Sequence, residues 1–350
     1  MTSTVEVSPA ARRSAELEDE ITADPSRFRI LTGDRPTGPL HLGHYFGTLH
    51  NRVRLQRRGV ELGLVIADYQ VLTDRDVADD LETHVLGLVA DYLAAGIDPD
   101  EAMIFTHSAV TALNQLMLPF LSLVTVPELQ RNPTVKEEIG HSRQAGVSGL
   151  MFTYPAHQAA DILFCKANLV PVGADQLPHL EVTRLIARRF NDRHGPVFGE
   201  PEALLSSAPL LLGTDGTKMS KSRGNAITLG TTAEETARLI RGAKTDAHRH
   251  ITYEPGTRPE VASLVLLAAL CEDRDPGEVA AEVGSGGAAA LKARVTEAVN
   301  GAFAPLRARR AELAADPGYL RSVLRAGNAR ATELAEATLA QVREVMGTRY

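Results

Sequence analysis

The chain has 350 residues, a length that predicts about two domains and allows a sizeable core. Hydrophobic residues make up 44% and charged residues 23%, as in ordinary globular proteins, and no apolar run reaches the roughly 18 residues of a membrane span. The first residues have no apolar core of signal-peptide type, so we expect a cytoplasmic protein. Two cysteines, Cys165 and Cys271, exclude a disulfide scaffold and are expected to be packed thiols.

The net charge of -7 argues at first sight against a polyanionic partner. Much of the negative charge lies in an acidic N-terminal extension, residues 1–26, which either forms a short helix around 10–22 or stays disordered. The stretch 238–258 is locally basic, because five Lys and Arg side chains stand there against Asp246 and Glu254. Such a surface binds a polyanion or is simply a solvated face, so a nucleic-acid partner is not excluded.

Strand and helix patterns alternate along the first part of the chain. A short strand is expected at 29–32, stopping at Gly33, and a loop at 33–39. Further helices are predicted at 40–58, 81–95, 154–167 and 177–189, and further strands at 62–67, 103–106 and 169–173. This alternation predicts an α/β fold with a parallel sheet covered by helices. From residue 232 onward only helical periodicity appears, so we place a boundary near 225–231.

The first motif with chemical content is 36–44, with the sequence PTGPLHLGH. A glycine-bearing loop leads here from a strand into a helix, and the exposed N–H groups of such a junction bind anions. His41 and His44 lie on one side of the helix start, where each can donate a hydrogen bond to a phosphate oxygen, and Gly43 leaves room for a flat base. The alternatives are a helix start with two solvated histidines and, less favoured for lack of further ligands, a zinc site.

The second motif is 218–222, with the sequence KMSKS, which follows the glycine-rich stretch 213–217. Lys218 and Lys221 stand three residues apart on a Gly/Ser loop, where they can neutralise a leaving pyrophosphate. The alternative is a solvated basic turn.

Together and in this order, the two motifs resemble the HIGH and KMSKS elements of the class I aminoacyl-tRNA synthetases. The resemblance implies a Rossmann-type doubly wound parallel sheet at 27–230, a helical anticodon-binding domain at 231–320 and a C-terminal helix at 321–350. It implies ATP and Mg²⁺ as cofactors and catalysis by His41, His44, Lys218 and Lys221. Lys136 matches a family lysine that reaches toward ATP, or is a solvated lysine. The residues implied to contact ATP are Arg35, Pro36, Thr37, Gly43, His44, Gly173, Ala174, Asp175, Leu210, Lys218, Met219, Ser220, Lys221 and Ser222.

Three further segments, 154–163, 170–176 and 179–184, resemble the tryptophanyl branch of that family. The resemblance implies that Asp161 accepts the indole N–H, which suits a ring nitrogen that can only donate. The apolar neighbours of Asp161 disfavour the alternative of a helix surface charge. The residues implied to bind tryptophan are Asp161, Tyr154, Gln158, Gln176, Gln70 and Leu31.

The tyrosyl branch is the alternative, because Tyr154, Gln158 and Asp161 also fit the spacing by which tyrosyl enzymes hold their amino acid. Those enzymes share the phenol hydroxyl with a tyrosine on the first strand, where this chain has Leu31. Without that tyrosine, the phenol hydroxyl of a bound tyrosine would lose one hydrogen-bond partner, at a cost of about 1–3 kcal/mol in binding free energy. This difference favours tryptophan as the substrate. Gln70 and Gln158 depart from residues common in tryptophanyl enzymes and suggest an altered response to tryptophan analogues.

The resemblance implies activation of L-tryptophan with ATP, giving tryptophanyl-AMP and pyrophosphate, and transfer of tryptophan to the 3′ end of tRNA(Trp). It also implies a homodimer, for which the apolar stretch 113–126 is a candidate interface, with buried core as the alternative. Two other functions stay open: an adenylate-forming enzyme that charges no tRNA, and a synthetase-like regulatory protein. The two intact motifs argue against a loss of catalysis.

Overall fold

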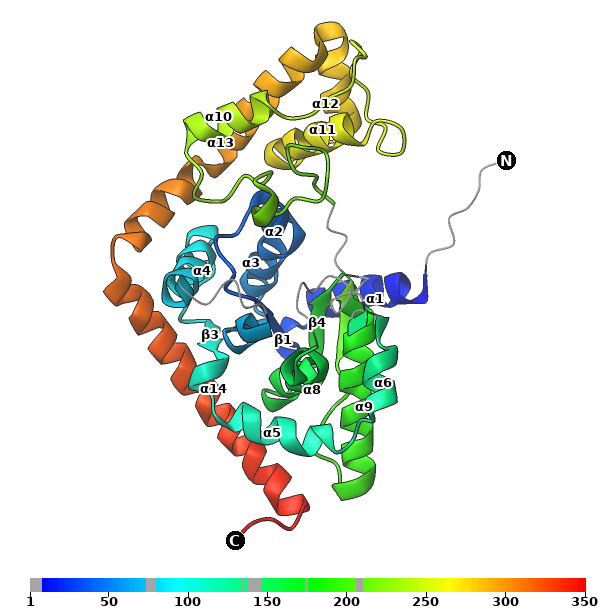
Figure 1. Cartoon of the computed structure of the whole chain (residues 1–350), viewed down its shortest axis with the longest axis vertical. Coiled ribbons are helices and arrows are strands. Elements are labelled where there is room, and N and C mark those ends of the chain that lie inside the picture. The colour runs from blue at the N-terminus through cyan, green and yellow to red at the C-terminus, as the bar shows by residue number, and fades with distance from the viewer. Residues whose placement is uncertain (1–7, 74–79, 134, 137–146, 174–175, 206–209) are drawn as a thin grey trace.

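A five-stranded parallel sheet forms the centre of the computed structural model (Figure 1). The structure describes residues 8–73, 80–133, 135–136, 147–173, 176–205 and 210–350. The strands lie in the order β3-β2-β1-β4-β5, and their bounds are Arg29–Asp34 (β1), Glu61–Ile66 (β2), Ala102–Thr106 (β3), Leu169–Val172 (β4) and Glu202–Leu205 (β5). The predicted doubly wound α/β fold is confirmed, although β5 was not among the expected strands.

Successive side chains of each strand enter different cores, as the pleat of a strand requires. Ile30 of β1 and Leu64 of β2 belong to one core, whereas Leu31 and Val65 belong to the other. The first core is closed by α1 (Pro9–Ala23), α3 (His50–Arg57) and α4 (Leu81–Ala95). The second is closed by α5 (Ala112–Leu121), α8 (Gly149–Phe164) and α9 (Leu177–His194), with α6 (Val126–Arg131) against α8. Helices on both faces define the doubly wound arrangement.

The acidic N-terminal extension is helical over α1 and docked, so the disordered alternative is wrong for that part. Leu17 and Ile21 are fully buried, and α1 packs against β5. Arg13 donates to Glu202 at 2.6 Å, while Glu18 accepts from Arg54 at 2.5 Å. Glu18 therefore ties this helix to α3, whereas Glu16 and Glu20 pair with Arg13 of the same helix.

The predicted helix at 40–58 is divided into three parts. It consists of α2 (Leu42–His44), a π-helical turn (Tyr45–Leu49) and α3. A π turn inside a helix adds one residue to the turn and often marks a functional site. Here it directly follows the HLGH motif.

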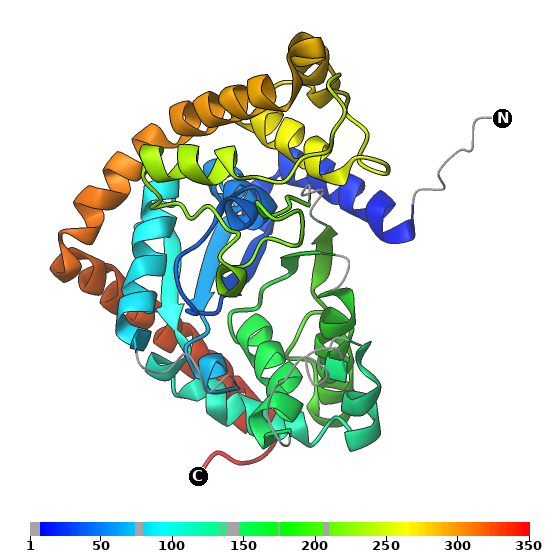
Figure 2. The same cartoon turned by 45° about the horizontal axis from the view of Figure 1, so that its top comes forward.

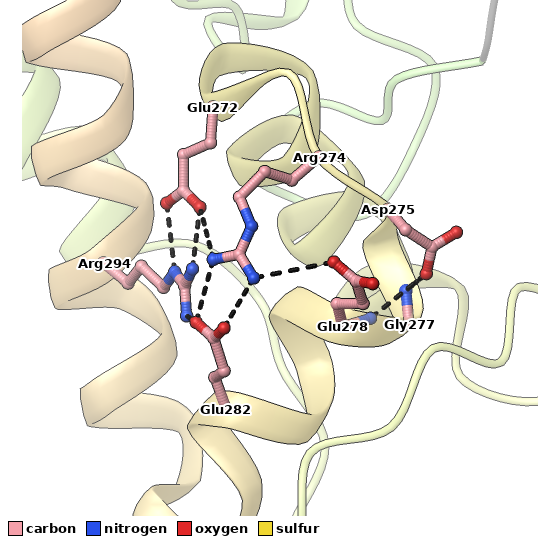
Figure 3. A network of polar contacts seen from close by, with 7 residues as sticks. All are labelled: Glu272, Arg274, Asp275, Gly277, Glu278, Glu282 and Arg294. Atoms are coloured by element: carbon pink, nitrogen blue, oxygen red, sulfur yellow. Dashed lines mark hydrogen bonds and ion pairs between the residues drawn. The ribbon is translucent and has the colours of Figure 1, made fainter.

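The C-terminal part contains five α-helices and, among the described residues from 232 onward, no strand, as expected: α10 (Ala233–Arg241), α11 (Pro259–Glu272), α12 (Pro276–Val283), α13 (Gly287–Ala314) and α14 (Pro317–Val345), with a loop at 243–258 between α10 and α11. A network of ion pairs joins α11, α12 and α13 (Figure 3), in which Arg294 bonds Glu272 and Glu282, each at 2.7 Å. Among the described residues, none of the helices has the length and apolar character needed to cross a membrane. Burial raises the pKa of both cysteine thiols to about 12, as expected of packed thiols.

The last helix returns to the sheet and covers its edge. Figures 1 and 2 show α13 running away from the helical part and α14 passing back beside β3, with which it packs. Asn328 accepts a hydrogen bond from the backbone N–H of Thr106 at 2.9 Å, and Arg330 donates to the carbonyl of Ala102 at 3.3 Å. Helix α14 therefore pairs backbone groups that an edge strand would otherwise leave open.

Gly327 allows this close approach, and its replacement by alanine should destabilise the protein. A Cβ atom at this position would lie 1.9 Å from the carbonyl oxygen of Ile104, a backbone atom that no rotamer change can move. We expect Gly327→Ala to lower the free energy of unfolding by about 3 kcal/mol, measured by urea denaturation. Gly301→Ala in α13 is the control, because open space surrounds that position and helical propensity predicts a gain of up to about 1 kcal/mol. Equal stability of the two variants would contradict the close packing of α14 on β3.

Candidate active site

The strand order reverses between β1 and β4, and in doubly wound sheets ligands bind beyond the carboxyl ends of the strands at this point. Strand β1 ends at Asp34, and the loop that carries the HLGH motif follows it. Strand β4 ends at Val172, directly before Gly173. The topology alone therefore places a ligand site beside both predicted segments.

A buried polar cluster fixes the end of β1. The carboxylate of Asp34 accepts from Arg52 of α3 at 2.5 Å and from the hydroxyl of Tyr92 of α4 at 2.7 Å. Burial would raise the pKa of the Asp34 carboxyl, but the Arg52 guanidinium and the Tyr92 hydroxyl more than offset this, so the pKa is lowered. The carboxylate thus stays charged and ties β1 to two helices.

The two motif histidines hold each other in place. The backbone N–H of His44 donates to Nδ1 of His41 at 3.3 Å, and that of His41 donates to Nδ1 of His44 at 3.2 Å. Because each Nδ1 accepts, each neutral ring carries its proton on Nε2, where it can donate to a ligand. His41 is buried, so the alternative of two solvated histidines is wrong for it.

Both histidines are neutral at physiological pH, and activity should therefore lack a titration from them. Burial, followed by neighbouring charges, lowers the pKa of His41 to about 3, and burial likewise lowers that of His44 to about 4. We therefore expect no fall in kcat/KM for ATP near pH 6.5 that arises from protonation of His41 or His44. A fall in kcat/KM near pH 6.5 that disappears in His44→Asn would contradict the neutral state assigned to these histidines. Protonation opposes folding here, so the pair's contribution to stability is complete above pH 6.5 and falls as the pH drops toward these values.

The KMSKS segment folds back onto the HLGH segment. Lys221 donates to the carbonyl of Gly38 at 2.7 Å, and Gly38 has the positive φ of 124° that favours glycine. A bridge pairs His41 with Thr228, and Gly43 lies beside Met219. Lys221 is half-buried, which excludes a freely solvated turn at this lysine, and its burial lowers the pKa of the ammonium. The structure thus joins the two motifs into one site.

Asn225 organises the loop before Lys221 and was not identified from the sequence. It is buried, and its Oδ1 accepts from the backbone N–H of Ser220 at 2.8 Å. Its Nδ2 donates to Asp215 at 2.7 Å and to the carbonyl of Lys218 at 3.2 Å. One amide therefore sets the backbone of the KMSKS loop. An asparagine three residues after this motif is the only signal that the sequence offered.

A second missed cluster connects the motif to the helical part. Asp91 of α4 is fully buried; one oxygen accepts from Arg310 of α13 at 2.5 Å and the other from the backbone N–H of Leu40 at 3.0 Å. Burial raises the pKa of the Asp91 carboxyl, and the Arg310 guanidinium partly offsets this rise. Since Leu40 precedes His41, this cluster links α13 directly to the HLGH motif.

Asp161 lies on α8 with its side chain buried, which excludes the surface alternative. Its Oδ2 accepts from Nε2 of His107, 2.9 Å away, while its Oδ1 has no hydrogen-bond partner among the described residues. His107 was not predicted; it follows β3 and is fully buried, and although burial lowers its pKa, the Asp161 carboxylate more than offsets this and raises it. Tyr154 lies two turns earlier on the same helix, and its hydroxyl pairs with His179 at 2.8 Å.

The remaining predicted residues lie at various positions around the joined HLGH and KMSKS motifs and around Asp161. Gln70 lies in a 3-10 turn (Tyr69–Thr73) that contacts α8, and Leu31 lies in the core on the α8 side of the sheet. Gln158 is on α8 and Gln176 directly precedes α9. Exposed positions are found at Arg35, Thr37, Lys136, Leu210 and Lys218, whereas Pro36 is buried. Ala174 and Asp175 lie outside the described residues, as does the side chain of Ser222.

The fold and the joined motifs define a nucleotide-binding enzyme of the class I synthetase type. The family described as "tRNA synthetases class I (W and Y)" matches residues 24–304. A tryptophan–tRNA ligase of Treponema pallidum is 44% identical over 332 residues, covering 91% of this chain and 97% of that relative. One of Thermotoga maritima is 38% identical, covering 92% of this chain and 100% of that relative. The chain therefore belongs to the tryptophanyl-tRNA synthetases, a family of tryptophan–tRNA ligases.

Solved structures agree with this assignment. The tryptophanyl-tRNA synthetase of Campylobacter jejuni, crystallised with ADP and tryptophan, superposes with a TM-score of 0.80 at 29% identity, covering 91% of this chain and 100% of that chain. That of Mycoplasma pneumoniae gives a TM-score of 0.78 at 26% identity, covering 91% of this chain and 97% of that chain.

Proposed function

We propose that the enzyme forms tryptophanyl-AMP at the carboxyl ends of β1 and β4, with the phosphates of ATP between the HLGH and KMSKS segments. A carboxylate oxygen of tryptophan attacks the α-phosphorus of ATP, and the bond to the bridging oxygen of pyrophosphate breaks. Nε2–H groups of His41 and His44 donate to the phosphate oxygens, and Lys221 neutralises the leaving pyrophosphate. The contact of Lys221 with the Gly38 carbonyl supports this proposal, because the ammonium lies against the loop that would bind the phosphates.

Tryptophan would enter between β1 and α8, with its indole N–H on Oδ1 of Asp161. That oxygen is buried and has no partner among the described residues, so a donor-only ring nitrogen would satisfy it. Leu31, on the facing strand, offers no group for a phenol hydroxyl, which supports tryptophan over tyrosine. Mg²⁺ would enter with the phosphates of ATP and lower their negative charge.

Pyrophosphate exchange tests the first half-reaction. We expect exchange of labelled pyrophosphate into ATP with L-tryptophan and Mg²⁺, none after removal of Mg²⁺ with EDTA, and far less with L-tyrosine. Charging of tRNA(Trp) then tests transfer of the amino acid to the terminal ribose. Exchange without charging would indicate an adenylate-forming enzyme, and the absence of both would indicate a regulatory protein.

The helical domain would read the anticodon, since unpaired bases are the readable part of an RNA. Much of the basic stretch 238–258 is neutralised internally, for example by the pairs Arg258–Asp246 and Lys244–Glu260. A hollow of about 690 Å³ between α10 and α13 is a further candidate, because Arg241 of this stretch and Lys292 of α13 line it, together with alanines, Thr296 and one carboxylate, that of Glu297. Salt should weaken tRNA binding there steeply.

A homodimer would cover the outer face of α5. Leu113 and Phe120 are fully buried in the core, so the core alternative is confirmed for these positions, but Leu118 is 72% and Val126 57% exposed. Exposed large apolar side chains close together favour a protein contact. Light scattering at increasing concentration tests this proposal, with Leu118→Glu expected to shift the protein toward a monomer.

A further inference from the structure

The proposed indole acceptor, Asp161, forms a buried cluster with two histidines, His107 and His157. His107 follows β3, whereas His157 and Asp161 lie four residues apart on α8 and so face the same side of that helix. One ligand atom from each lies within 4.8 Å of the others, and the two imidazole rings are 4.4 Å apart. All three side chains are buried, with His157 only 2% exposed.

The cluster satisfies few of its own polar atoms. The one hydrogen bond found between its members joins His107 Nε2 to Asp161 Oδ2. Among the described residues, neither nitrogen of His157 has a hydrogen-bond partner, nor do Nδ1 of His107 and Oδ1 of Asp161. A buried polar atom without a partner destabilises the folded protein, so an additional ligand is favoured here. Bound tryptophan has one indole N–H and would satisfy only one of these atoms.

We propose that His107, His157 and Asp161 bind a borderline transition-metal cation such as Zn²⁺, and that this cation competes with tryptophan for the site. Two imidazoles and one carboxylate are a ligand set that zinc accepts, with a fourth position left for water. Zinc bonds of about 2.0–2.1 Å set ligand atoms about 3.4 Å apart, so separations of up to 4.8 Å must shorten by about 1.5 Å at most, while the 2.9 Å pair of His107 and Asp161 must widen slightly. The competition rests on the proposed function, since it requires Asp161 to be the indole acceptor; the metal site does not.

Metal binding by the whole chain tests the site directly. After chelator treatment, Zn²⁺ is titrated against a chromophoric chelator, and we expect one zinc per chain. His157→Gln removes one ligand but retains a polar side chain of similar size, and should weaken binding at least about tenfold. His248→Gln, at an exposed histidine remote in sequence from the cluster, is the matched control and should bind zinc as the parent does. Absence of zinc binding, or binding that both variants retain equally, would overturn the site and leave buried water as its occupant.

Competition between Zn²⁺ and L-tryptophan can be measured from the fluorescence of L-tryptophan. The chain contains no tryptophan, so indole fluorescence in the sample comes only from L-tryptophan. We expect Zn²⁺ to displace bound L-tryptophan from the parent at concentrations that have no such effect on His157→Gln, and saturating L-tryptophan to weaken zinc binding. Zinc that binds through His157 but leaves tryptophan in place would overturn the competition, and with it the role of Asp161, while the metal site would stand. Pyrophosphate exchange without added zinc reports on the proposed function separately.

Discussion

Lys221→Met should lower kcat for tryptophan-dependent pyrophosphate exchange about 100- to 1000-fold, the usual cost of removing one preorganised group that stabilises transition-state charge. The ammonium is half-buried and bonded to the Gly38 carbonyl, so in the proposed reaction it would meet the pyrophosphate already in position. Its charge matters most when the bond to pyrophosphate breaks. The dissociation constant of L-tryptophan, read from ligand fluorescence, should therefore change much less than kcat.

Lys244→Met is the matched control for this substitution. Lys244 follows the same motif in the chain, but its exposed ammonium pairs with Glu260 at 2.8 Å, an interaction of small energetic value. Its exchange rate should remain within a few-fold of the parent. Unchanged exchange in Lys221→Met, or an equal loss in both variants, would contradict the assignment of Lys221.

The elements that could be predicted from the sequence are those with strong local signals. Helix α4 occupies the predicted 81–95 because its apolar residues recur on one side and Gly96, with φ of 105°, ends it. Strands β2, β3 and β4 are mainly apolar, as is typical of a buried parallel sheet. Strand β5 has only four residues and partly exposed positions, so it has no comparable signal. The π turn after HLGH follows from packing and leaves no periodic pattern.

The site could be predicted where a motif concentrates it and not where distant residues meet. His41, His44 and Lys221 stand in short motifs and come together as expected. Arg310 and Asp91 are more than two hundred residues apart in the sequence, yet they form an ion pair. The contact of His107 with Asp161 joins the end of β3 to helix α8. Such pairs depend on the topology of the sheet, which composition and periodicity do not define residue by residue.

The HLGH segment is supported from both parts of the chain. Asp34, Arg52 and Tyr92 fix its entry from the sheet side, and Arg310 reaches it from α13 through Asp91. The C-terminal helical part is therefore linked through hydrogen bonds to the loop that would bind ATP. A shift of α13 on RNA binding would act on His41 through one buried carboxylate and one backbone N–H.

Asp161→Asn should lower kcat/KM for L-tryptophan about 100-fold, the equivalent of about 3 kcal/mol. The substitution retains the size of the side chain, so packing of α8 should be preserved. His107 Nε2 donates to one oxygen of Asp161, and the amide would turn its single oxygen toward that donor. The NH₂ group would then face the indole N–H, and two donors would meet where a donor and an acceptor met before.

Asp161→Ala provides the comparison, and Asp19→Asn on the exposed side of α1 is the control for loss of one carboxylate. If loss of the acceptor is what impairs both variants, kcat/KM for L-tryptophan should fall by similar factors in Asp161→Asn and Asp161→Ala. The dissociation constant of ATP should stay close to that of the parent. An Asn variant with parental kcat/KM would show that a neutral amide oxygen suffices, or that the indole N–H bonds elsewhere. Both outcomes would contradict Asp161 as the charged acceptor, because hydrogen bonds to ionised groups are about twice as strong as neutral ones.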